Sequence, residues 1–245
     1  MTDVPKDERP PRTKGWRRIA VAVLTTLSHG TAPLITTFVL IHLAAPVLAI
    51  VGGSSLASQT MLLGREYYQT ALGEPFLLFA PLLLHPLTST LRRVLAPHLA
   101  RPLPNSFTLA GYAASFSIVG HVLANRVFPM DPAPPVLAVG PAELDFEFVK
   151  LAVQTWPVRT VVAYTGLVAA VVWHATQGMA IMWNRYLRAA LGGVSVGARK
   201  TALVTAGVLL TVYTSLYVLA NEPPMVLAST AARFHAALIK SPMFA

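Results

Sequence analysis

The sequence predicts an all-α polytopic membrane protein, a bundle of five transmembrane helices. The chain of 245 residues is 54% hydrophobic and 12% charged, against about 25% charged in an ordinary soluble domain. Its mean hydropathy is +0.58, and five apolar stretches are each long enough to cross roughly 30 Å of hydrocarbon. So few charges could not cover a soluble domain of this size, which argues against a soluble enzyme and against a disordered chain. The absence of cysteine excludes disulfides, iron–sulfur clusters and cysteine-ligated zinc.

The apolar runs place the five spans within a transmembrane domain of residues 19–220, at about residues 27–50, 75–95, 107–128, 160–186 and 201–220. The first apolar stretch, 19–51, is too long for one straight crossing. Residues 19–26 are therefore expected to lie at the interface or to extend the helix outward. Residues 129–157 are Pro-rich and acidic and predict a sizeable exposed loop, and residues 221–245 predict an amphipathic tail on the surface.

The charges alternate from loop to loop in a way that supports this topology. With five spans, one side holds residues 1–18 as a basic tail, plus the second and fourth loops. That side carries 13 basic residues against three acidic ones, whereas the other side carries six against seven. Basic loops stay on the cytosolic side, so the N-terminus is predicted to be cytosolic. The net charge of +9 is thereby explained by the lipid bilayer as partner, and no nucleic-acid partner is expected. No cleavable secretory signal or matrix transit peptide is evident, so the first span is expected to act as a retained targeting signal.

Four of the seven histidines fall inside predicted spans, one on each of the first four: His42, His85, His121 and His174. An ionisable side chain at membrane depth is costly and by default marks a functional site. Successive spans run in opposite directions, so His42 and His121 are expected toward the far side. His174 is expected toward the positive side, and His85 near the centre of its span. The expected pairs are His42 with His121 and His85 with His174.

Small residues share helix faces with these histidines. Gly166, Ala170 and Gly178 recur at intervals that place them on the face of His174. Small residues mark faces where membrane helices approach closely, so the histidines are expected to point into the bundle. The predicted helix-packing positions are Gly111, Gly120, Gly166, Ala170 and Gly178.

Two interpretations of the histidines remain open. In the first, His42/His121 and His85/His174 are axial pairs for one or two b-type haems, and the glycines make room for the flat macrocycle. In the second, each neutral imidazole hydrogen-bonds a neighbouring helix and simply holds the bundle together.

No catalytic motif is present. The sequence contains no nucleotide-binding glycine loop, no HExxH and no G-x-S-x-G, so no enzymatic activity is predicted. Arg92, Arg93 and Arg126 lie near span ends and are candidate contacts for a lipid headgroup or a partner.

Several short segments occur in a distinctive order and spacing over roughly residues 28–186. The segments are Tyr67-Tyr68-Gln69, Glu74-Pro75, His85-x-x-x-Ser89-x-x-Arg92-Arg93, Gly111-Tyr112, Gly120-His121-Val122-Leu123-Ala124-Asn125-Arg126-x-x-Pro129, Tyr164-x-Gly166-Leu167 and Trp173-His174-x-x-x-Gly178. In these segments the sequence resembles the transmembrane domain of the fungal MCP-type mitochondrial outer-membrane adaptors.

The resemblance implies a location in the mitochondrial outer membrane and a role in recruiting a bridge-like lipid-transfer protein to mitochondria. More distantly, the domain is similar to the haem-bearing membrane anchors of succinate dehydrogenase and fumarate reductase, a fold-level analogy. Two functions are therefore left open. One is a non-enzymatic adaptor in mitochondrial lipid homeostasis, acting at organelle contacts. The other is a bis-histidine b-type haem protein, electron-carrying or quinone-linked. A transporter is less favoured, because no second full-length inverted repeat and no charged residue within a span core is present.

Overall fold

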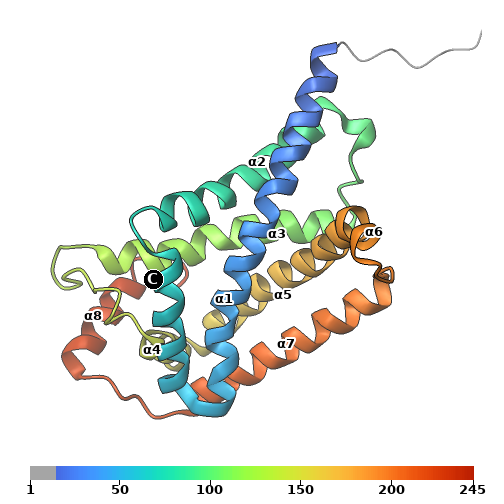
Figure 1. Cartoon of the computed structure of the whole chain (residues 1–245). Coiled ribbons are helices and arrows are strands. Elements are labelled where there is room, and N and C mark those ends of the chain that lie inside the picture. Colours follow the sequence, from blue (N-terminus) through green and yellow to red (C-terminus); the bar gives the residue numbers. More distant parts are fainter. Residues whose placement is uncertain (1–14) are drawn as a thin grey trace, which may run out of the picture.

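The computed structural model describes residues 15–245, and these form helices without any strand (Figure 1). The α-helices are α1 (Gly15–Tyr68), α2 (Ala80–Leu95), α3 (Ser106–Val122), α4 (Phe146–Thr155), α5 (Pro157–Met182), α6 (Arg188–Leu191), α7 (Ala198–Asn221) and α8 (Ala228–Leu238). Short π or 3₁₀ segments extend them: η1 (Gly73–Phe79), η2 (Pro97–Leu99), η3 (Leu123–Val127), η4 (Phe128–Met130) and η5 (Trp183–Leu187). Four helical stretches are long and apolar enough to cross a membrane, namely Gly15–Tyr68, Ser106–Met130, Pro157–Leu191 and Ala198–Asn221.

Helix α1 is a helical hairpin, broken at Gly52–Gly53. Gly53 has φ +61°, a left-handed conformation that glycine adopts without steric cost. A Cβ at Gly53 would also lie 2.2 Å from a carboxylate oxygen of Glu222. The first arm runs without interruption from Gly15, so residues 19–26 extend the helix outward. The second arm, 54–68, returns along the first, with Ala49 and Ala57 fully buried.

The region of the second expected span is also helical, although α2 alone is short. η1 and α2 follow each other without a gap, so Gly73–Leu95 forms one continuous helical stretch. At their junction the N–H of Ala80 bonds the carbonyl of Pro75, the wider spacing of a π-turn. Pro81 has no N–H to donate, which explains why the regular ladder begins only after this point.

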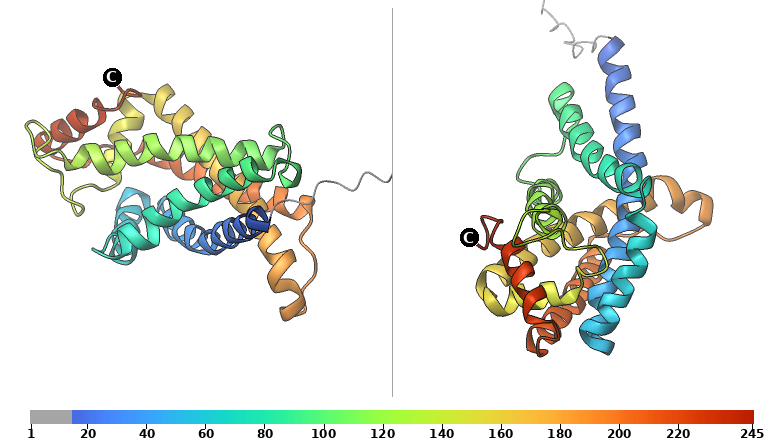
Figure 2. Two further views of the ribbon diagram at one scale, coloured as in Figure 1. Left: turned by 90° about the horizontal axis from the view of Figure 1, so that it is seen from above. Right: turned by 90° about the vertical axis from the view of Figure 1, so that its left-hand side faces the viewer.

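The long helices form two groups. α1 packs along α2, and α3 packs along α5, while α7 contacts both α1 and α5 (Figure 2). Buried Val168, Val172 and Val212 join α5 to α7, with Leu43 and Val47 of α1 packed against them. α2 touches α3 only slightly. α1 and α2 are in contact where Ser28 meets Ser89, and beyond this contact they splay toward the N-terminal end of α1 (Figure 2).

The segment 129–157 and the C-terminal tail are packed against each other, which corrects the prediction that 129–157 is an exposed loop. Helix α4 lies within the segment expected to be an exposed loop. Its N-cap Asp145 accepts a hydrogen bond from the backbone of Glu147 at 2.9 Å. α8 covers it, and Phe148 and Phe234 meet edge to face in a shared apolar core. We call residues 129–157 with 226–244 the cap. The cap was not predicted from the sequence, because its two amphipathic helices, α4 and α8, lie far apart in the chain.

Two ion pairs connect the parts of the cap, and they predict acid sensitivity. Arg233 binds Glu143, and Lys240 binds Asp131. Hydrogen bonds from these cations hold the pKa of both carboxyls below their ordinary values. A lowered folded pKa contributes stability that is present above the ordinary value and is lost as the pH falls through the lowered one. We therefore expect hydrogen-exchange protection of α8 to drop below about pH 4.5, the ordinary glutamate value, while α5 stays protected. Equal protection of α8 across this range would contradict the assignment.

A buried polar network joins the α1 hairpin to the cap. Lys150 is 1% exposed, and its ammonium lies 2.6 Å from Glu147 and 3.5 Å from Glu222. Glu222 accepts the backbone N–H of Ser54 at 3.0 Å, at the first turn of the second α1 arm. Glu147 accepts the N–H of Met225 at 2.8 Å. One lysine thus holds together the α1 break, α4 and the end of α7.

Candidate functional site

Two pairs of histidines lie between the two helix groups. His42 of α1 faces His121 of α3 with ring centroids 5.9 Å apart, and the ring planes are nearly perpendicular at 83°. His85 of α2 faces His174 of α5 at 6.1 Å and 81°. The structure therefore brings together the histidines that their depth along the spans had paired. Each pair connects the α1/α2 group with the α3/α5 group.

The His85–His174 pair is oriented by backbone carbonyls. Nδ1 of His85 donates to the carbonyl of Ser28 at 2.9 Å, and Nδ1 of His174 donates to the carbonyl of Phe107 at 3.0 Å. Carbonyls exposed on neighbouring helices thus fix one tautomer of each ring. Neither Nε2 has a hydrogen-bond partner among residues 15–245, which leaves its lone pair available. This arrangement, with one nitrogen donating and the other left as a ligand, is typical of metal-binding histidines.

Packing on α3 fixes the ring of His174 further. Phe107 stacks on it with centroids 4.4 Å apart and planes inclined by 16°. Gly111 lies one turn further along α3, and a Cβ there would come 2.7 Å from Cε1 of His174. Gly111 is therefore a close-approach position, since only glycine leaves room for the ring where it stands.

The His42–His121 pair has an aromatic frame and weaker polar orientation. Phe38 stacks on His42 at 5.2 Å, and Tyr68 and Tyr164 approach the two rings edge-on. Nδ1 of His42 is buried and has no hydrogen-bond partner within residues 15–245. Nδ1 of His121 meets only the amide of Asn125, one turn along its own helix, at 3.3 Å. In the described part of the chain, no backbone carbonyl accepts a hydrogen bond from either ring, so neither tautomer is fixed in that way.

The donor set favours a ligand held by two nitrogens. No group of three or more His, Asp or Glu side chains that could hold a metal ion occurs within residues 15–245. An imidazole nitrogen binds a metal at about 2 Å, so two rings on opposite sides of one ion have their nitrogens about 4 Å apart and their centroids farther apart still. Separations of 5.9 and 6.1 Å are compatible with that arrangement. Of the two pairs, His85–His174 fits it better, because both of its rings are oriented by second hydrogen bonds.

The other predicted packing residues divide into two classes. A Cβ at Gly178 would meet Phe107 at 3.9 Å, an ordinary contact between α5 and α3. Gly120 and Gly166 have nothing within 4 Å of that position, so they are not close-approach sites and the packing prediction was wrong for them. Ala170 is partly buried on α5.

The three candidate arginines also differ. Arg126 is bound by both oxygens of Glu74, at 2.6 and 2.8 Å, and its expected role as a headgroup contact is therefore corrected to an internal ion pair between η3 and η1. Arg93 donates to the carbonyl of Arg101 at 2.7 Å and closes the loop after α2. Arg92 lies in the last turn of α2, partly buried, at the end rich in arginine.

Sequence reasoning missed the residues that hold the histidine rings. Phe38 precedes His42 by one helical turn, an i, i+4 spacing that brings side chains together on a helix, so this partner was detectable. Phe107, Ser28 and the carbonyls that they offer come from other helices, and no spacing within one segment predicts them.

Residues 116–221 match the family model of the transmembrane domain of MDM10-complementing protein 1. The match runs from the middle of α3 to the end of α7 and includes His121 and His174. It confirms the resemblance to the MCP-type family. It does not support the more distant comparison with haem-bearing anchors. No curated protein and no solved structure matches the chain.

Proposed function

Because residues 116–221 match the transmembrane domain of MDM10-complementing protein 1, we propose that this chain is an integral protein of the mitochondrial outer membrane that acts in mitochondrial lipid homeostasis. It would serve as a non-enzymatic adaptor that recruits a cytosolic lipid-transfer protein at organelle contacts. The family match is the observation that carries the proposal. A membrane protein with several apolar helices and one strongly basic end fits such a role.

The proposed topology has five crossings with a cytosolic N-terminus. Four crossings are the long apolar stretches, and the fifth is Gly73–Leu95. This fifth segment is continuous helix and runs back along the first arm of α1. Five crossings place the basic loops on one side and the cap on the other. The basic tail, residues 1–18, would meet the partner. Of this tail, residues 1–14 lie outside the described part of the chain.

Expression of the chain in fungal cells that lack MDM10 tests the proposal. We expect it to restore their growth and mitochondrial shape, and a tagged copy to fractionate with the outer membrane. A variant that lacks residues 1–15 should insert normally but lose rescue and lose the recruited lipid-transfer protein. Absence of rescue by a correctly inserted full chain would contradict the lipid-homeostasis role. Rescue by the truncated variant would contradict recruitment through the tail.

A second candidate function is binding of a b-type haem, and the orientation of His85 and His174 favours it. In both rings Nε2 has no hydrogen-bond partner among residues 15–245, and both rings are held through Nδ1 by backbone carbonyls. These two residues would hold the iron, with His42 and His121 as a second possible pair. A haem with two histidine ligands supplies one-electron transfer. The two functions are compatible, since a haem can stabilise an adaptor. An absorption spectrum of protein purified from haem-supplied cells tests this candidate, and a colourless preparation would exclude it.

A further inference from the structure

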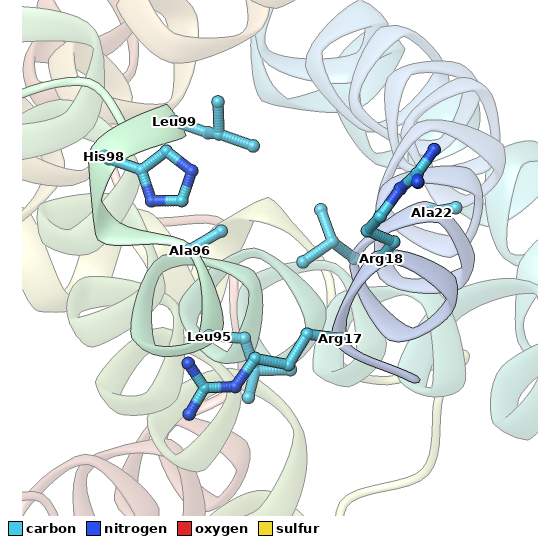
Figure 3. Close-up of a pocket in the computed structure, with 8 residues that line it drawn as sticks. Arg17, Arg18, Ala22, Leu95, Ala96, His98 and Leu99 are labelled. Atoms are coloured by element: carbon cyan, nitrogen blue, oxygen red, sulfur yellow. The ribbon is translucent and has the colours of Figure 1, made fainter. Parts of the chain in front are cut away.

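A cavity of about 270 Å³ opens between the beginning of α1 and the end of α2, at the basic end of the molecule (Figure 3). It lies where the two helices splay after their contact at Ser28 and Ser89, whose hydroxyls are 2.9 Å apart. Arg17 reaches across from α1 toward Leu95, and His98 stands on the opposite wall. The cavity is distinct from the histidine pairs, none of which lines it.

The positive charges at this cavity have no acidic neighbour in the described part of the chain. The ion pairs within residues 15–245 use Arg126, Lys150, Arg233 and Lys240, and none of these lines the cavity. The acidic residues of that range all belong to the second α1 arm, η1, the cap or the end of α7: Glu66, Glu74, Asp131, Glu143, Asp145, Glu147 and Glu222. Arg17 and Arg18 therefore create a local excess of positive charge at the cavity.

The remaining walls are apolar. Val21, Leu95 and Leu99 line the cavity, and Leu99 is 66% exposed. Trp16, which precedes Arg17 in the chain, is 56% exposed, and the guanidinium of Arg17 lies 5.5 Å from its ring. Exposed tryptophan beside arginine at the end of an apolar helix is typical of the headgroup level of a membrane.

We propose that this cavity binds an anionic glycerophospholipid of the cytosolic leaflet. The Arg17 guanidinium would hold the phosphate through two parallel hydrogen bonds, and an acyl chain would lie along Val21 and Leu95. A soluble phosphate would interact only with the positive charges. A lipid would also cover the apolar walls with its acyl chain. Basic pockets between membrane helices on the cytosolic side are suited to such headgroups. The assignment to the cytosolic leaflet rests on the proposed cytosolic N-terminus, whereas binding of an anionic lipid at this cavity is independent of the adaptor role and of haem binding.

Native mass spectrometry of the full-length protein tests the proposal, with phosphatidylglycerol as the anionic probe and phosphatidylcholine of the same acyl chains as the neutral one. The protein is expected to retain phosphatidylglycerol in preference. One basic residue near the membrane contributes about 1 kcal/mol of attraction, so Arg17→Gln should weaken this binding about fivefold. Val21→Trp keeps every charge but fills the cavity, and it should reduce binding at least as much.

Arg188→Gln is the matched control, because Arg188 is exposed at the same basic end and does not line the cavity. It is expected to leave binding unchanged. An equal loss in Arg188→Gln would overturn the proposal in favour of general attraction by the basic end. Competition by inorganic phosphate at constant ionic strength, without an effect of Val21→Trp, would assign a free-anion site instead and would also overturn it. Circular dichroism of each variant confirms that it is folded.

Discussion

Lys150→Met is expected to destabilise the protein by about 3–5 kcal/mol, because removal of one partner from a buried ion pair leaves uncompensated charge. Lys150 is 1% exposed, and its ammonium lies 2.6 Å from Glu147 and 3.5 Å from Glu222. Without the lysine, two carboxylates would face each other at the α1 break. Thermal or denaturant unfolding of the detergent-purified protein measures the loss.

The pH dependence of this loss identifies its cause. Burial alone would raise the pKa of Glu222, but hydrogen bonds from Ser54 and the charge of Lys150 outweigh burial, and the pKa lies below its ordinary value. Wild-type protein therefore loses stability as the pH falls through that lowered pKa. In Lys150→Met, protonation instead relieves the repulsion between carboxylates. The difference between variant and wild type should therefore shrink in acid.

Two further variants separate charge from packing. Glu147→Gln combined with Lys150→Met removes one charge of each sign and should recover about half of the lost stability. Lys200→Met makes the same substitution at an exposed position and should have little effect. If the double variant were as unstable as Lys150→Met, lost packing rather than unpaired charge would explain the effect.

Hydropathy predicted the long helices well because the hydropathy of a membrane span depends only on the residues within that span. Ala198–Asn221 and Ser106–Met130 lie within a few residues of the expected spans. The α1 hairpin was not predicted, although Gly52–Gly53 is a local signal for a break. The second arm carries serines, a glutamine and an arginine, so its apolar content is too low for a span search.

The cap was not predictable from local pattern. α4 has ten residues and follows a Pro-rich stretch, so its helical period is short and its apolar face has no visible partner in sequence. That partner, α8, begins more than 70 residues later. The burial of Lys150 was unpredictable for the same reason. In the sequence, Glu147 and Lys150 form an i, i+3 pair of the kind that is ordinarily exposed, and only the fold brings Glu222 and Ser54 to it.

The histidines illustrate what depth can and cannot predict. Alternating span direction was enough to pair His85 with His174, because depth is a property of each span alone. The orientation of the rings depends on carbonyls and an aromatic ring supplied by other helices. The need for glycine at position 111 likewise depends on His174, which comes from another helix and occupies the space beside Gly111. The role of the pairs as haem ligands stays a prediction.

Protein purified from haem-supplied cells is expected to show a Soret band that His174→Gly abolishes or at least halves. The ring of His174 is held by Phe107 through both stacking and its carbonyl, so its removal takes away the better oriented ligand. His85→Ala should have the same effect, because loss of either axial ligand weakens the hold of a bis-histidine site on its haem. His42→Ala and His121→Ala should leave at least half of the band. The visible absorption per mole of protein measures all four.

Three additions make this experiment decisive. His98→Ala removes an exposed histidine outside both pairs and should leave the band unchanged. Gly111→Val keeps every histidine but forces a side chain toward Cε1 of His174, where a Cβ would already lie at 2.7 Å, so it should weaken the band. Imidazole added to His174→Gly should restore the band, because it fills the gap with the same nitrogen ligand. If the band were absent in wild type and His174→Gly only lowered the unfolding temperature, the rings would stabilise the bundle by hydrogen bonds between helices and would not be haem ligands.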